Sequence, residues 1–165
     1  MTVRTILTWP DKRLRTPAAD VVEVNDEVRA IWQDMVDTMD AMPGVGLGAQ
    51  QIGVMLRLAV VDTSEARNKR IFLANPEVID ASAIMNVHEE ASPCLSGVSA
   101  KISRPRGVRV RYMDETGAVV ERDFVGLDAT SVQHQIDHLA GKMYFDRLSK
   151  MKRDMLLKRA RKVNG

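Results

Sequence analysis

The chain has 165 residues, of which 45% are hydrophobic and 28% are charged, and its formal net charge is +2. This composition is typical of one globular domain, which we expect to span residues 1–165, and it excludes a chain that is disordered throughout. No apolar run reaches the roughly 18 residues that cross a membrane, so we expect no membrane partner.

The start of the chain and its single cysteine bear on cellular location. The segment MTVRTILTWPDKRLR has no apolar region followed by a small-residue cleavage site. Cys94 is the one cysteine, so an internal disulfide is impossible. Both features favour a reducing compartment. We therefore predict a cytoplasmic protein, with an organelle matrix as the alternative for a processed chain.

The first regular element that the sequence predicts is a helix over residues 26–42. It follows an irregular stretch, begins at a cap formed by Asn25, and repeats apolar side chains at helical spacing. Pro43 and Gly44 end this helix, and a glycine-rich loop, GVGLGAQQIG, comes directly after it.

Strand signals fill the middle of the chain. We predict strands at 56–63, at 71–74 before the break Asn75-Pro76, and at 84–89, then a β-hairpin of 108–113 and 119–125 around the turn DETG. A second helix is predicted from Asp128, as its cap, to about Tyr144. Strands in the middle and helices at both ends indicate an α+β fold.

The positive charge is concentrated at the C-terminal end, in a last helix that we predict over 149–163. Residues 150–165 carry seven Lys and Arg and one Asp. A solvated helix packed through its stripe of Met151, Met155 and Leu156 explains this pattern, and so does a contact with a polyanion. No aromatic side chains are interleaved with the basic ones, so stacking on bases is not indicated.

The stretch QHQIDH, residues 133–138, places two histidines four residues apart. On a helix, His134 and His138 lie about 40° apart on one face. Imidazole nitrogens suit zinc, iron(II) and related ions. Cys94, in ASPCLSG, is able to complete a set of three ligands with a fourth position open for water, which is the pattern of a catalytic site. The nearly opposite face is apolar: Val132, Ile136, Leu139 and Met143.

Ordinary structural roles explain the same residues. Two histidines on a helix can be hydrogen-bonded residues of the core or the surface. A single cysteine is more often a small buried hydrophobe, and the glycine-rich loop can be a plain turn after the helix. Spacing alone therefore leaves both metal binding and a structural role open.

Three motifs, in this order, resemble those of the peptide deformylase family, which removes the N-formyl group from nascent bacterial-type proteins. The family motifs G-x-G-L-A-A-x-Q, E-G-C-L-S and Q-H-E-x-D-H correspond to GVGLGAQQ at 44–51, SPCLS at 92–96 and QHQIDH at 133–138. The flanks ILTWPDKRLR, LANPEVI and HLAGKMYFDRLSKMKR are also similar. The resemblance spans about residues 5 to 155.

The resemblance implies a fold and a set of site residues. Antiparallel β-sheets would pack around a central helix carrying both histidines, followed by a C-terminal helix. One divalent metal ion, Fe²⁺ or Zn²⁺, would be held by Cys94, His134 and His138. Gln51 and the backbone N–H of Leu95 would face the formyl oxygen and stabilise its charge. The substrate-binding positions of the glycine-rich loop would be Gly44, Val45 and Gly46.

The implied function is that of a metal-dependent hydrolase in protein biosynthesis. It would cleave the amide of N-formylmethionyl peptides and release formate, in the N-terminal processing of new chains. Its partner would be a formylated peptide or the N-terminus of a nascent chain. The resemblance also implies a contact between the basic C-terminal helix and the ribosome, which would be salt-sensitive, and no DNA partner.

Four departures from the family pattern bear on activity. Gly48 stands in place of an alanine, Ser92 and Pro93 in place of Glu-Gly, Thr130 in place of an arginine, and Gln135 in place of the glutamate. That glutamate takes a proton from the attacking water and passes it to the leaving amine. A glutamine has no carboxylate to do this, and positioned acid–base catalysis is worth roughly 10²–10⁴ in rate.

We therefore expect deformylase activity that is weakened or lost. Two alternatives stay open: a non-catalytic homologue that binds nascent-chain N-termini or ribosomes, and a hydrolase for a different acyl substrate. The loss of an acid at 92 also predicts that a nearby arginine lacks its partner, with Arg106 as the candidate.

Overall fold

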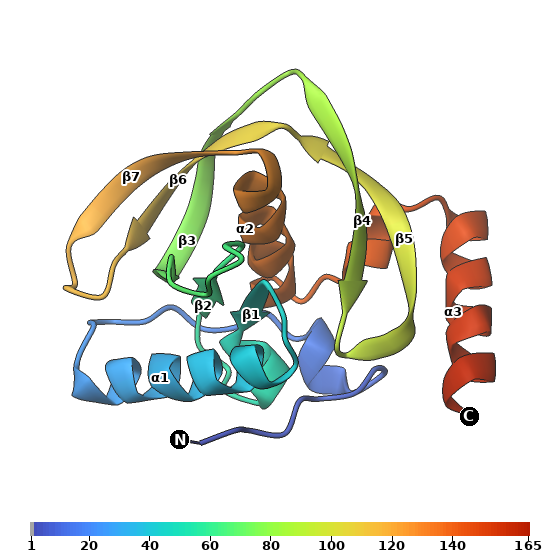
Figure 1. The fold of residues 1–165 in the computed structure, drawn as a ribbon, viewed down its shortest axis with the longest axis horizontal. Helices are drawn as coiled ribbons and strands as arrows, with labels where there is room; N and C mark the ends of the chain where they lie inside the picture. Colours follow the sequence, from blue (N-terminus) through green and yellow to red (C-terminus); the bar gives the residue numbers. More distant parts are fainter. Residues whose placement is uncertain (1) are drawn as a thin grey trace.

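The computed structural model describes residues 2–165. The predicted α+β class is confirmed (Figure 1): β-strands enclose a central helix, α2 (Gly126–Leu139), while α1 (Asp26–Ala41) lies along one side and α3 (Lys150–Asn164) packs at the outer edge. No helix in this range is both long and apolar enough to span a membrane.

Strands within residues 2–165 form two antiparallel sheets. One has five strands in the order β1-β2-β3-β6-β7, and the other consists of β4 and β5. The bounds are β1 (Gly46–Gly48), β2 (Leu58–Val61), β3 (Ile71–Ala81), β4 (Met85–Ser92), β5 (Leu95–Pro105), β6 (Gly107–Met113) and β7 (Val119–Val125). The predicted hairpin is β6–β7, and the strand predicted at 56–63 is the shorter β2.

Helix α1 (Asp26–Ala41) forms almost where the sequence predicts it. The side chain of Asn25 accepts a hydrogen bond from the N–H of Val28 at 3.0 Å and so caps the first turn. Its apolar face packs in one core with residues of β1 and β2. The buried residues of α1 are Val28, Trp32, Met35, Val36, Thr38 and Met39.

The predicted bounds of the second helix were wrong at both ends. Helix α2 (Gly126–Leu139) begins two residues before Asp128 and ends well before Tyr144. Gly126 has φ of 62° and lets the chain turn sharply from β7 into the helix. After the helix, Gly141 has φ of 79°, and a Cβ there would lie 2.6 Å from the carbonyl oxygen of Arg15. Tyr144 belongs to a separate 3₁₀ helix, η3 (Tyr144–Arg147).

Strand β3 does not stop at Asn75, as predicted, but continues past it to Ala81. Asn75 takes a left-handed φ of 52°, and the pairing of β3 with β6 shifts register there. The side chain of Asn75 pairs with the backbone of Val21, accepting at 2.7 Å and donating at 2.8 Å. The local break is therefore absorbed as a bulge.

Two strands, β1 and β5, were not predicted. Strand β1 lies inside the glycine-rich loop and is followed by a 3₁₀ helix, η2 (Ala49–Ile52). Strand β5 pairs with β4, which runs three residues further than the predicted 84–89. Helix α3 (Lys150–Asn164) is capped by Ser149 and packs on β5 with Leu156 and Ala160 buried.

Candidate metal and peptide site

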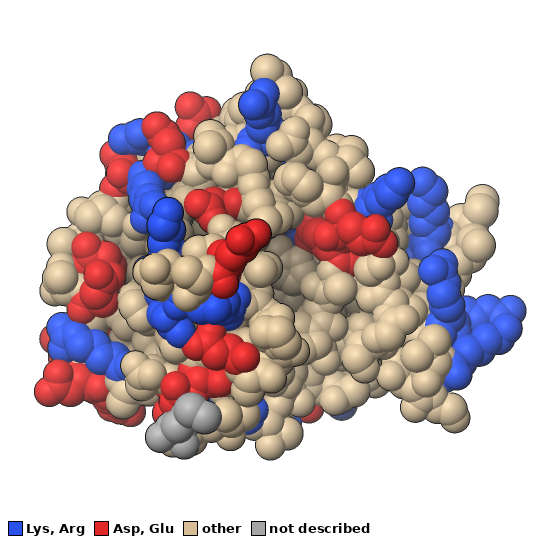
Figure 2. Space-filling view, viewed as in Figure 1, with Lys and Arg blue, Asp and Glu red and all other residues tan. Residues whose placement is uncertain are grey.

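A cavity of about 460 Å³ lies beside α2, between the chain after α1 and the β4–β5 hairpin. The predicted substrate residues Gly44, Val45 and Gly46 line it, as do Gln51 and the start of QHQIDH, His134 and Gln135. Figure 2 shows a hollow on this face with acidic side chains beside it. The loop and helix motifs therefore meet at one cavity.

The two histidines lie together on one face of α2. Their ring centroids are 4.9 Å apart, and both side chains are buried. Tyr144 stacks on His134 with 5.9 Å between centroids and 17° between planes. The helix thus brings the two imidazoles to one place, as their spacing predicts.

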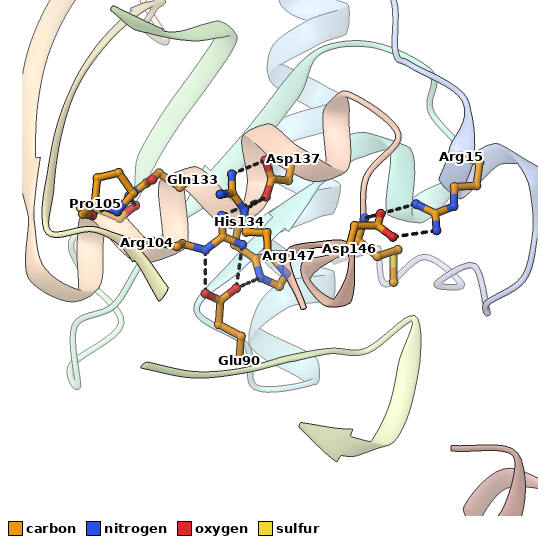
Figure 3. Close-up of polar contacts among 11 residues, drawn as sticks. Arg15, Glu90, Arg104, Pro105, Gln133, His134, Asp137, Asp146 and Arg147 are labelled. Atoms are coloured by element: carbon orange, nitrogen blue, oxygen red, sulfur yellow. Dashed lines mark hydrogen bonds and ion pairs between the residues drawn. The ribbon is translucent and has the colours of Figure 1, made fainter. Parts of the chain in front are cut away.

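A buried carboxylate fixes the orientation of His134. Nδ1 of His134 lies 2.8 Å from Oε1 of Glu90 on β4 (Figure 3). Burial alone would raise the pKa of Glu90, but hydrogen bonds from His134 and Arg104 outweigh it and hold that pKa below its ordinary value. An ionised carboxylate only accepts, so Nδ1 of His134 donates to it and Nε2 is the ring nitrogen that faces away from this contact. Metal-ligating histidines commonly have this arrangement.

Arg104 of β5, which is 1% exposed, joins two buried acids. Its Nε and Nη2 donate to Glu90 at 2.6 and 2.9 Å, and its Nη1 donates to Asp137 of α2 at 2.9 Å (Figure 3). Arg147 of η3 also pairs with Asp137. Arg106, the arginine predicted to lack an acid partner, is exposed and makes no ion pair among the described residues, whereas the buried arginine is Arg104 and its acid is Glu90.

Cys94 lies in the tight turn between β4 and β5, where Ser92 pairs with Leu95. Pro93 precedes it and suits the first central position of such a turn. The thiol is fully buried, and the amide Nε2 of Gln51 donates to its sulfur at 3.5 Å. Burial raises the pKa of the thiol, against the lowering effect of its bonds with Gln51 and Ser92.

His138 is fully buried and lies next to Ser92. Its Nε2 is 3.4 Å from the Ser92 hydroxyl, while its Nδ1 has no hydrogen-bond partner among the described residues. Burial, followed by the effect of His134, lowers the pKa of His138 well below its ordinary value. The imidazole is therefore neutral near pH 7, which is the form that binds metal.

The three predicted ligands share one region but do not form a closed cluster. Across residues 2–165, no group of three or more His, Cys, Asp or Glu side chains is placed so that it could hold a metal ion. The donor chemistry nevertheless fits: a neutral His138, a His134 held by Glu90, and the Cys94 thiol beside Gln51.

Cys94 and Leu95 lie beside a second cavity and not beside the first. Both line a second cavity of about 390 Å³, bounded by the N-terminal segment and α3, and neither borders the first. Gln51, by contrast, borders the first cavity and contacts the thiol, so its amide lies between the two regions. Its Oε1 is held by the N–H of Gly48 at 2.8 Å.

Gln135 forms part of the cavity wall and is 4% exposed. Its Oε1 is buried and has no hydrogen-bond partner among the described residues. Its Nε2 lies against Gly46, where an added Cβ would be only 2.8 Å away. The residue at 135 is therefore a buried amide with an unused acceptor, placed next to the loop that lines the cavity.

Comparison with known proteins decides the family. A model of the family described as polypeptide deformylase matches residues 3–154. The chain is also 42% identical to the peptide deformylase of Afipia carboxidovorans, over 99% of this chain and 96% of that protein.

The chain belongs to the polypeptide deformylase family.

Solved peptide deformylases share its fold. The structure from Legionella pneumophila matches with a TM-score of 0.92 at 36% identity, covering 98% of this chain and 95% of that one. The structure from Ehrlichia chaffeensis in complex with actinonin also matches with a TM-score of 0.92, at 33% identity and 99% coverage of both chains. The predicted arrangement of antiparallel sheets around α2 is therefore that of the deformylase fold.

The departures from the deformylase motifs meet at the first cavity. Ser92, Pro93, Thr130 and Gln135 all line it. A Cβ on Gly48 would lie 3.4 Å from Oε1 of Gln135, so the changes at 48 and 135 are in contact. The positions at which the motif comparison predicted departures therefore lie close together around the first cavity.

Glu90, Arg104 and Asp137 form the polar cluster beside His134 and were not predicted. Glu90 follows directly after the strand predicted at 84–89, and its burial becomes clear only once β5 pairs with β4. Arg104 lies on a strand that was missed. Thr130 is held by His88, whose Nδ1 is 2.7 Å from its hydroxyl, at the rim of the cavity.

Proposed function

We propose that this chain is a slow peptide-deformylase-type hydrolase that binds N-formylmethionyl peptides in the first cavity and releases formate. Family membership supports the reaction type. The slow rate of hydrolysis is inferred from one observation, the buried amide of Gln135 in the wall of the first cavity. It can hold a water or a substrate N–H at its free Oε1, but it cannot take up a proton near neutral pH.

We infer that Cys94, His134 and His138 would hold one divalent metal ion, Fe²⁺ or Zn²⁺. Support comes from the neutral His138, from the hydrogen bond of His134 Nδ1 with Glu90 that orients the other ring nitrogen, and from the nearby thiol. When bound, such an ion polarises a carbonyl and lowers the pKa of water. Ligand binding by Cys94 would release its proton, since burial keeps the thiol protonated.

The remaining roles fall to this chain's own groups. We propose that the Gln51 amide and the backbone N–H of Leu95 face the formyl oxygen, and that Gly44, Val45 and Gly46 receive the peptide backbone. A pair of fixed donors is useful where negative charge develops on an oxygen. Gln51 is suited to hold its position, because Gly48 fixes its Oε1 and the thiol accepts from its Nε2.

Formate release from a formyl-Met tripeptide tests this proposal. We expect slow release, about 10²–10⁴-fold below that of a deformylase with glutamate at this position. Release at a rate equal to such an enzyme would overturn the assigned effect of Gln135. Tight peptide binding without any formate would support the alternative of a non-catalytic homologue. Faster cleavage of another N-acyl group in a panel would support the alternative of an altered acyl substrate.

We also propose that the protein works in the cytoplasm on nascent chains, with α3 contacting the ribosome. Lys152, Lys158 and Arg159 are exposed on α3, and basic side chains are visible at that edge in Figure 2. Phosphate contacts would make binding fall steeply with salt. The Lys158→Glu/Arg159→Glu variant should then co-sediment with ribosomes less than the native chain at low salt. Equal co-sedimentation of both would contradict the contact.

A further inference from the structure

The last turn of α3 is tied to the strand that forms one wall of the first cavity. Nδ2 of Asn164 donates to the carbonyl oxygen of Ser96 at 2.8 Å, and the Ser96 hydroxyl donates back to Oδ1 of Asn164 at 3.1 Å. Ser96, Gly97 and Val98 all line that cavity. One side chain at the end of the helix therefore holds both the carbonyl oxygen and the hydroxyl of a cavity-lining residue.

The contact continues at the next residue of the strand. Gly97 has φ of 84°, a conformation that residues with a side chain rarely adopt. A Cβ at this position would also collide with the side chain of Val163, so α3 lies directly against the backbone of Gly97. The strand and the helix end are thus fitted to each other over two successive residues.

The rest of α3 is anchored in the same core as the site. Leu156 and Ala160 are each 2% exposed and belong to the buried cluster that contains Cys94, Leu95 and Val98. Nδ2 of Asn164 also donates to the carbonyl oxygen of Ala160 at 3.0 Å, which fixes the amide relative to the helix. The helix therefore serves as a firm support on which Asn164 presents its two bonds.

We propose that Asn164 is a positioning residue, whose two bonds to Ser96 hold the segment 95–98 and so set the cavity wall and the direction of the Leu95 N–H. This inference rests on one part of the proposed function, namely that the formylated peptide binds in the first cavity. The C-terminal turn of α3 thus becomes part of the peptide site. This role is independent of any partner that binds the basic side chains of α3. Loss of the two bonds should loosen 95–98 without unfolding the helix.

The test compares Asn164→Ala with the control Lys162→Ala in the metal-loaded full chain. Lys162 is exposed on the same turn and makes no hydrogen bond or ion pair among the described residues. We expect Asn164→Ala to speed amide hydrogen exchange at residues 95–98 and to weaken binding of a formyl-Met tripeptide about three- to tenfold, which is the effect of about one ordinary hydrogen bond. Lys162→Ala should change neither quantity.

A second variant separates positioning from general stability. Ser96→Ala removes only the bond from the hydroxyl, so it should give a smaller effect, and adding it to Asn164→Ala should cause no further loss. Unchanged exchange at 95–98 in Asn164→Ala, whatever its thermal midpoint, would overturn the proposal. If the native chain bound no formylated peptide, the proposed function would be wrong, while the exchange data would still decide the role of Asn164.

Discussion

The Gln135→Glu variant should release formate from a formyl-Met peptide about 10²–10⁴ times faster than the native chain. The side chain at 135 is buried in the cavity wall, and no donor among residues 2–165 reaches its Oε1. A carboxylate in that place would be desolvated without compensating hydrogen bonds, so its pKa would rise toward neutrality. That is the range in which a carboxylate both accepts and returns a proton.

A matched control is available on the same helix. Gln133 is also a buried glutamine, 5% exposed, but its Nε2 donates to the carbonyl oxygens of Pro105 and Ala129. Gln133→Glu should therefore lose stability and gain no activity. If Gln135→Glu gained nothing while holding its metal, the limiting change would lie at Ser92, Pro93 or Gly48, and our assignment of the lost rate to Gln135 would be wrong.

The Arg104→Ala variant should lose about 3–5 kcal/mol of unfolding free energy, because removing one partner of a buried ion pair leaves the other charge buried and unpaired. Arg104 is almost fully buried, and its removal leaves Glu90 without its main partner and Asp137 with Arg147 alone. Because Glu90 also orients His134, the variant should bind metal less well. Urea unfolding measured by circular dichroism gives the free energy.

Arg109→Ala is the control for this loss. Arg109 also reaches two acids, Glu121 at 3.9 Å and Asp123 at 3.1 Å, but its side chain is 42% exposed. Such surface pairs contribute about 0–1 kcal/mol. Equal destabilisation by the two variants would show that the buried cluster of Glu90, Arg104 and Asp137 is not the support we describe.

The elements that could be predicted from sequence are those set by local spacing. His134 and His138 share a face because four residues make about one helical turn, and Asn25 starts α1 through its own side chain. The predicted first and last residues of the helix that carries the histidines were less accurate. Its start depends on Gly126 and its stop on a close approach between Gly141 and Arg15, a contact over long sequence distance.

The support of the site could not be predicted, because it depends on strand register. Glu90 and Arg104 lie 14 residues apart and meet through the β4–β5 hairpin. The sequence of β5, LSGVSAKISRP, interrupts its apolar residues with small and polar ones, so it lacks a clear strand pattern. The sequence already shows Ser92 where the family motif has an acid, but only the structure shows that Glu90 supplies the buried carboxylate.

The association of Cys94 with α2 likewise came from motif order and not from local physics. Its turn is fixed by the pairing of Ser92 with Leu95, and its contact with Gln51 brings together residues 43 positions apart. The cavity was predicted only in part, since the predicted loop residues line it together with Val98, which no motif indicated.

The metal content of the purified chain, measured by elemental analysis after loading with Fe²⁺ or Zn²⁺, tests the central claim most directly. We predict one divalent ion per native chain, retained in His88→Ala, whose imidazole bonds Thr130, and lost in Cys94→Ser, His134→Ala and His138→Ala. A native chain that binds no ion, or three ligand variants that all keep it, would contradict the account.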